Sequence, residues 1–202
     1  MLTYTMKRFT ALFFAIILSA AVLAVLPIHG ESEIYDNVIR IHVLANSDSE
    51  EDQRLKLAVR DRVNAEAARI TSGCREVEEA EAALRAELPR IISAAQETLA
   101  EEGSALEVTA ELGRERYPTR EYEDMRFPAG EYTSLRIMLG SAEGKNWWCV
   151  LFPPLCLAGA EDAREELTEA GFTPGQIGLL TDSENPKYVL RFKLLEIFAG
   201  LF

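Results

Sequence analysis

The sequence is poor in histidine, and this scarcity limits the chemistry that the protein can perform. Among 202 residues there are only two histidines, His29 and His42. The short motifs of serine hydrolases, zinc proteases, P-loop proteins and Cys-x-x-Cys redox proteins are also missing. Since His29 lies in the N-terminal targeting segment described below, any Ser-His or Cys-His mechanism has to use His42. We therefore expect no catalytic, cofactor-binding or metal-binding residues and no small-molecule substrate.

Basic residues are also few. The chain has 21 lysines and arginines against 33 aspartates and glutamates. Residues 31–202 hold 19 of the basic and all 33 of the acidic side chains, which gives a formal net charge of −14. Such a domain repels a phosphate backbone, so nucleic acid is not an expected partner. The acidic surface serves either solubility or attraction to a basic partner, and composition does not separate these two roles.

Charged residues are missing from Phe9–Leu26, an apolar run that follows two positive charges. This order is typical of a secretory signal, and Gly30 is small enough for the cleavage position. The run also approaches the roughly 20 residues that span a bilayer as a helix. Residues 1–30 are therefore interpreted as a signal peptide or an uncleaved signal anchor, and the sequence leaves both open. In either case the positive charges before the run place residues 31–202 outside the cytoplasm as a single exported domain.

Hydrophobic periodicity predicts several strands in the exported domain. Alternating apolar residues indicate strands at 38–45, 106–112 and 131–139, with a further short strand around 119–125. The segment 147–152 is apolar on both faces, a composition that suits the centre of a sheet.

Spacings of three and four residues predict the helices. They comprise a helix that starts after a Ser47–Glu50 capping box, a helix at 76–102 that Pro89 kinks or divides, a short acidic helix near 162–170 and a C-terminal helix at 187–198. The elements follow the order strand, helix, helix, several strands and C-terminal helix. This order predicts an α+β fold in which helices pack on one face of a mainly antiparallel sheet.

The segment from Gly144 to Cys156 has the most unusual composition in the chain. It contains both tryptophans, two adjacent prolines and two cysteines. Cys149 and Cys156 flank a short proline-containing loop, so we expect them to form a disulfide or to remain buried thiols. Alternation lets only one of the adjacent tryptophans point into a given layer, and the other is either buried differently or exposed as a protein-binding hot spot.

A catalytic alternative would use His42. Together with Cys149 or Cys156 it would form the dyad of an exported hydrolase, if the fold brings the strands together. A single histidine in a strand is more often a structural hydrogen-bonding group. Metal binding by His42 with Asp48, Glu50 and Glu51 has weaker support, because acidic residues at a helix start are explained by the helix dipole.

Four segments carry a resemblance to a known family. They are Ile39–Asp61, which begins with IRIHVLANSDS, then Phe127–Arg136, Gly144–Cys156 and Arg191–Lys193. In this order, over residues 38–197, they resemble stage II sporulation protein R. The stretch 159–186 is poorly patterned, and nothing is transferred to it.

The resemblance implies a protein made in the forespore of an endospore-forming bacterium and exported into the space between the forespore and mother-cell membranes. There, proteins of this family activate a membrane-embedded aspartic protease of the mother-cell membrane, which processes the precursor of sigma factor E. Such a ligand needs a binding surface and no catalytic groups of its own.

We expect the partner surface on the turn after the first strand together with the tryptophan and proline segment. It would consist of Asn46, Ser47, Asp48, Ser49, Trp147, Trp148, Pro153 and Pro154. The turn has more polar residues than one helix cap needs, and the prolines fix a second turn beside aromatic residues. The alternative is that the turn only caps the helix and the tryptophans only fill the core.

Overall fold

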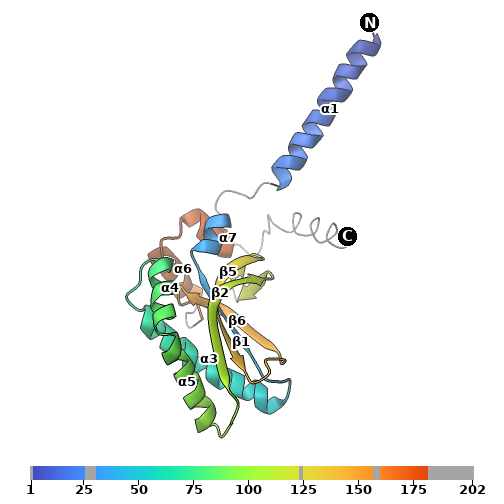
Figure 1. Ribbon diagram of the computed structural model, residues 1–202. Coiled ribbons are helices and arrows are strands. Elements are labelled where there is room, and N and C mark those ends of the chain that lie inside the picture. The colour runs from blue at the N-terminus through green and yellow to red at the C-terminus, as the bar shows by residue number, and fades with distance from the viewer. Residues whose placement is uncertain (1, 26–30, 123–124, 157–159, 182–202) are drawn as a thin grey trace. The chain divides into compact units, whose positions relative to one another are not determined.

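The computed structural model describes residues 2–25, 31–122, 125–156 and 160–181 (Figure 1). The chain divides into two units, and helix α1 (Leu2–Val25) belongs to the first of them. The second unit, Ser32–Ser183, contains the sheet. Within the described ranges, no helix combines the length and the apolar character that crossing a membrane requires.

A four-stranded sheet forms the centre of the second unit, with the strand order β2-β5-β1-β6. Its strands are β1 (Ile39–Leu44), β2 (Val108–Tyr117), β5 (Gly130–Leu139) and β6 (Asn146–Phe152). β1 is parallel to β5, whereas the β1–β6 and β2–β5 pairs are antiparallel. A separate antiparallel hairpin consists of β3 (Arg120–Tyr122) and β4 (Met125–Phe127). The predicted α+β class with a mainly antiparallel sheet is confirmed.

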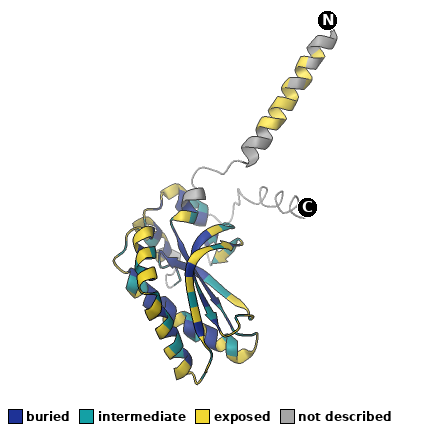
Figure 2. Ribbon diagram, viewed as in Figure 1, coloured by how far each residue is buried: buried dark blue, intermediate teal, exposed yellow. Residues whose placement is uncertain are grey.

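Three helices cover one face of the sheet, as Figure 1 shows. They are α3 (Glu50–Thr71), α4 (Val77–Ala86) and α5 (Leu88–Glu101). Strand β1 is largely buried (Figure 2), and its alternate residues Ile39, Ile41 and Val43 belong to one apolar cluster with residues of all three helices. Each such aliphatic side chain contributes about 1.5–3 kcal/mol relative to its exposed state. Pro89 lies in the first turn of α5, so the predicted long helix is divided at this point.

The opposite face of the sheet carries a second, smaller core. It includes Ile34 from α2 (Glu31–Asp36), aromatic residues of β2, β4 and β5, and apolar residues of α6 (Ala160–Glu169) and α7 (Pro174–Thr181). Helix α6 is the predicted acidic helix, whereas α7 was not predicted. The helix predicted at 187–198 lies outside the described residues.

Two local predictions were wrong. β6 was expected at the sheet centre, but it is an edge of the described sheet. It is apolar on both faces because Cys149 and Leu151 join the main core while Val150 joins the second core. In place of the expected Ser47–Glu50 capping box, Ser49 is the N-cap residue of α3. Its Oγ accepts a hydrogen bond from the backbone N–H of Asp52 in the first turn of the helix. Ser49 directly precedes this helix, which is the position from which a side chain reaches the free N–H groups.

Candidate functional site

The turn Asn46–Ser49 is held against the β5–β6 turn by side-chain hydrogen bonds. The Asn46 side-chain oxygen accepts from the backbone N–H of Ser141 at 2.9 Å. Asp48 Oδ1 accepts from the backbone N–H of Lys145 at 2.7 Å. The extra polar residues of this turn therefore position a second turn, in addition to capping α3.

The same turn is tied to helix α3. Ser47 Oγ donates to Asp52 Oδ2 at 2.5 Å, and Asn46 Nδ2 donates to the same oxygen at 2.9 Å. These two hydrogen bonds lower the pKa of the Asp52 carboxyl. Lys56 Nζ donates to the carbonyl of Lys145 at 3.1 Å, and burial lowers the pKa of its ammonium group. The turn thus has a fixed shape, with much of its hydrogen-bonding capacity used inside the protein.

Trp147 and Trp148 lie beside this turn on opposite faces of β6. Trp147 packs against the main core and Trp148 against the second core, and both are half-buried. A guanidinium group faces each indole: Arg60 lies 5.2 Å from the ring centre of Trp147, and Arg120 lies 3.7 Å from that of Trp148. Partly exposed tryptophan and arginine side chains of this kind are the commonest energetic centres of protein interfaces.

Pro153 and Pro154 follow the far end of β6. This strand has seven residues, so its ends lie about 20 Å apart at roughly 3.3 Å per residue. The structure therefore brings Asn46–Ser49 and Trp147 together but places the two prolines elsewhere. They line a cavity of about 650 Å³ with residues of α6 and of the end of α3.

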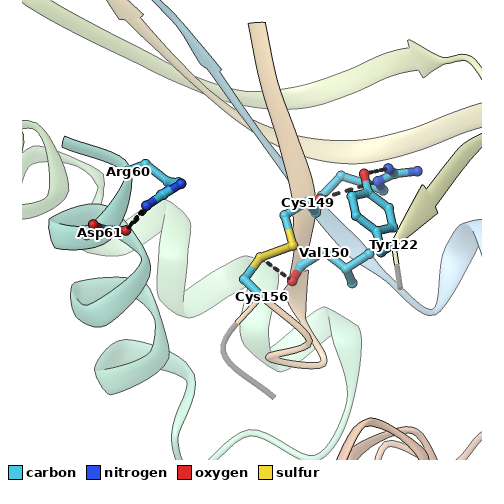
Figure 3. Close-up of a disulfide and its surroundings, with 7 residues drawn as sticks. Arg60, Asp61, Tyr122, Cys149, Val150 and Cys156 are labelled. Atoms are coloured by element: carbon cyan, nitrogen blue, oxygen red, sulfur yellow. Dashed lines mark hydrogen bonds and ion pairs between the residues drawn. A yellow bond between two sulfur atoms is a disulfide. The ribbon is translucent and has the colours of Figure 1, made fainter. Parts of the chain in front are cut away.

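A disulfide bond joins Cys149 in β6 to Cys156 after the proline turn (Figure 3). Their Cα atoms are 5.9 Å apart, and Cys156 Sγ lies 2.8 Å from the carbonyl oxygen of Val150. Cys74, the third cysteine of the chain, keeps a free thiol. Burial, and then the charge of Glu79, raise the pKa of this thiol. It is therefore mainly protonated at neutral pH, which makes it a slow nucleophile.

His42 is buried on one face of the sheet in a chain of polar contacts. Its Nδ1 lies 2.8 Å from Glu115 Oε1, and Ser134 Oγ donates to Glu115 Oε2 at 2.7 Å. Burial raises the pKa of Glu115, but the hydrogen bonds from His42 and Ser134 lower it more, so that the net shift is downward. The carboxylate lies between the hydroxyl and the imidazole, whereas a Ser-His mechanism requires the imidazole beside the hydroxyl.

In the described part of the chain, no nucleophile therefore lies beside His42, the histidine that the hydrolase alternative has to use. Cys149 pairs in register with Ile41, the neighbour of His42, and so points to the other face of the sheet. Both Cys149 and Cys156 are also joined in the disulfide. Across the described ranges, no group of three or more histidine, cysteine, aspartate or glutamate residues could hold a metal ion.

Arg40 in β1 is the most unusual buried residue, and it was not predicted from the sequence. Its side chain is fully buried, and its guanidinium carbon lies between 4.2 and 5.6 Å from the ring centres of Tyr117, Tyr122, Phe127 and Tyr132. Arg40 Nη2 also donates to the Tyr122 hydroxyl at 2.5 Å. The concentration of aromatic residues between Tyr117 and Tyr132 was a signal for a second core. A single sequence does not show that these rings surround an arginine.

Comparison with known proteins places these features in a family. The model of the family described as Stage II sporulation protein R (spore_II_R) matches residues 35–162. A curated relative, the Stage II sporulation protein R of Bacillus subtilis (strain 168), is 45% identical over 123 residues. This match covers 61% of the present chain and 55% of the relative, so it spans little more than half of the relative's length. No solved structure matches.

Proposed function

The chain belongs to the stage II sporulation protein R family and has a role in sporulation, and we propose that it is a secreted signalling protein that activates a membrane-embedded aspartic protease. In this proposal the protein is exported from the forespore into the intermembrane space, by a signal segment that is cleaved or kept as an anchor. It binds the protease of the mother-cell membrane, and the protease then processes the sigma-E precursor.

The observation that carries the proposal is the family match, which includes β1, the helical layer, β6 and the proline turn. The surroundings of His42 support a binding role over a hydrolase, because the described residues place no nucleophile beside it. A formal charge of −14 on residues 31–202 is compatible with association with a basic protein surface, as it is with a role in solubility.

We place the partner surface at Trp147 and Trp148 with the adjoining turn Asn46–Ser49. Because this turn is held by hydrogen bonds to two other segments, little ordering is needed when it binds. Aromatic groups on a rigid support are the usual centres of affinity in protein interfaces.

Activation can be tested by coexpression in a bacterium that does not form spores. We expect the sigma-E precursor to be cleaved when the full chain and the protease are both present, and to remain uncleaved when either is omitted. Immunoblotting of the precursor measures the result. His42→Gln should retain activation, because glutamine keeps a hydrogen-bonding group and removes proton transfer, although it also removes the ring that lies 5.1 Å from that of Trp148. If cleavage does not depend on the full chain, the proposed function is wrong. If the His42→Gln variant folds but is inactive, a catalytic role for His42 regains support.

The tryptophan surface makes a separate prediction. Trp147→Ala or Trp148→Ala should lower activation by more than about 30-fold, which corresponds to a binding loss of about 2 kcal/mol. Trp→Phe at the same position should be much less damaging, since phenylalanine keeps an aromatic ring. Thermal unfolding measured in parallel corrects for lost packing. An activity loss that follows only the folded fraction in both alanine variants would assign these tryptophans to the core.

A further inference from the structure

The cavity at the far end of β6 has two kinds of wall. Its lining includes the apolar residues Phe152, Pro153 and Pro154 and the acidic residues Glu166 and Glu169 of α6, of which Glu169 is exposed. Its volume of about 650 Å³ exceeds that of any single side chain and is within the usual range of binding pockets. A ligand that fits both walls has an apolar stem and a polar end.

The electrostatics of this cavity favour a cation. Within the described part of the chain, neither Glu166 nor Glu169 forms an ion pair with a basic residue, and Arg75 is the one basic residue of the lining. Burial raises the pKa of Glu166, and the negative charges of Glu169, Glu165 and Asp162 raise it further. A positive group between the two carboxylates would relieve this repulsion.

We propose that the cavity binds a lysine or arginine side chain from an extracytoplasmic segment of the protease. The inference rests on the proposed function and adds the chemistry of one contact. The methylene stem of the basic residue would lie on Phe152 and Pro153, and its charged end would meet Glu166 and Glu169 in charge-assisted hydrogen bonds. The contact lies at the opposite end of β6 from the tryptophan surface, so that both ends of the strand take part in binding.

Cys74 provides a direct measure of occupancy, because it lines the same cavity and is the only free thiol of the chain. We would follow alkylation of Cys74 by iodoacetamide in the purified full chain, in mild detergent, with and without the purified protease. Binding of a protease side chain should slow the alkylation at least about tenfold, since it covers the thiol. An unchanged rate in a sample that contains the bound protease would overturn the proposal.

Charge reversal tests the chemistry of the occupant. Glu166→Lys with Glu169→Lys should lower activation by at least about tenfold and remove the protection of Cys74. Glu97→Lys with Glu101→Lys is the matched control, because both residues are exposed on α5 and the change in net charge is the same. The control should behave as the unaltered chain does. Should the lysine pair on α6 impair folding, Glu166→Gln with Glu169→Gln removes the charges with little change of shape and should still weaken activation.

The outcomes separate this inference from the proposed function. If the unaltered chain does not activate the protease, the proposed function fails. If it does activate the protease and the folded α6 variants activate equally well, only the inference about the cavity fails. Protection of Cys74 that persists in the charge-reversed variant would show that the occupant is not a cation and would also overturn it.

Discussion

Replacing Gly144 with alanine is expected to destabilise the protein by about 3 kcal/mol, at the upper end of what overpacking costs. A Cβ atom at this position would lie 2.2 Å from the carbonyl oxygen and 2.5 Å from the carbonyl carbon of Ser47. These are backbone atoms, which cannot rotate away as a flexible side chain can. The β5–β6 turn would have to move, and with it the hydrogen bonds that Gly144 donates to Ala45 and that Lys145 donates to Asp48.

Urea unfolding of the full chain measures this effect, and Gly113→Ala is its control. A Cβ atom at Gly113 meets no atom within 4 Å, so alanine there should change the free energy of unfolding by less than about 1 kcal/mol. Equal unfolding midpoints for the Gly144 variant and the unaltered chain would mean that the two turns do not approach each other closely. Loss of activation in a Gly144→Ala variant that is still folded would indicate that the shape of the junction is recognised.

The parts of this fold that sequence analysis predicted depend on local interactions. The β1 and β2 strands follow from alternation, and the break between α4 and α5 follows from Pro89, which lacks an N–H group and clashes with a preceding helical turn. The acidic helix α6 was predicted near residues 162–170, within a stretch whose pattern is weaker. Each of these signals lies within a few residues of the element that it specifies.

The features that were missed depend on contacts between distant segments. The edge position of β6 depends on which strands pair with β1. The apolar composition of β6 does not predict this position, because central strands and edge strands that are covered on both faces have the same composition. The polar residues of Asn46–Ser49 were predicted to exceed the needs of a helix cap, and the excess was assigned to a partner surface, whereas Asn46 and Asp48 bind the β5–β6 turn. Their contacts with Ser141 and Lys145 could not be foreseen, because nearly 100 residues separate the two turns. The cavity likewise needs α3, the proline turn and α6 together.

Replacing Arg40 with alanine is expected to cost about 3–5 kcal/mol of stability, comparable with removal of a large core side chain. The side chain is fully buried, so truncation leaves a space among the surrounding aromatic rings. It also removes the hydrogen bonds to the Tyr122 hydroxyl and to the carbonyl of Cys149. The strongest cation–π contact with a desolvated ring contributes roughly 2 kcal/mol to the stability that is lost.

A second variant, Arg40→Met, separates packing from charge. Arg40 forms no ion pair with an acidic residue among the described residues, so the cost of removing its charge from water, several kcal/mol, is offset mainly by the rings and two hydrogen bonds. Methionine fills much of the space and avoids this desolvation, so we expect it to restore the free energy of unfolding to within about 1.5 kcal/mol of the unaltered chain. If urea unfolding finds methionine as destabilising as alanine, the guanidinium itself holds the aromatic residues together. If neither change lowers stability, Arg40 is not buried in solution, and the second core does not form around it.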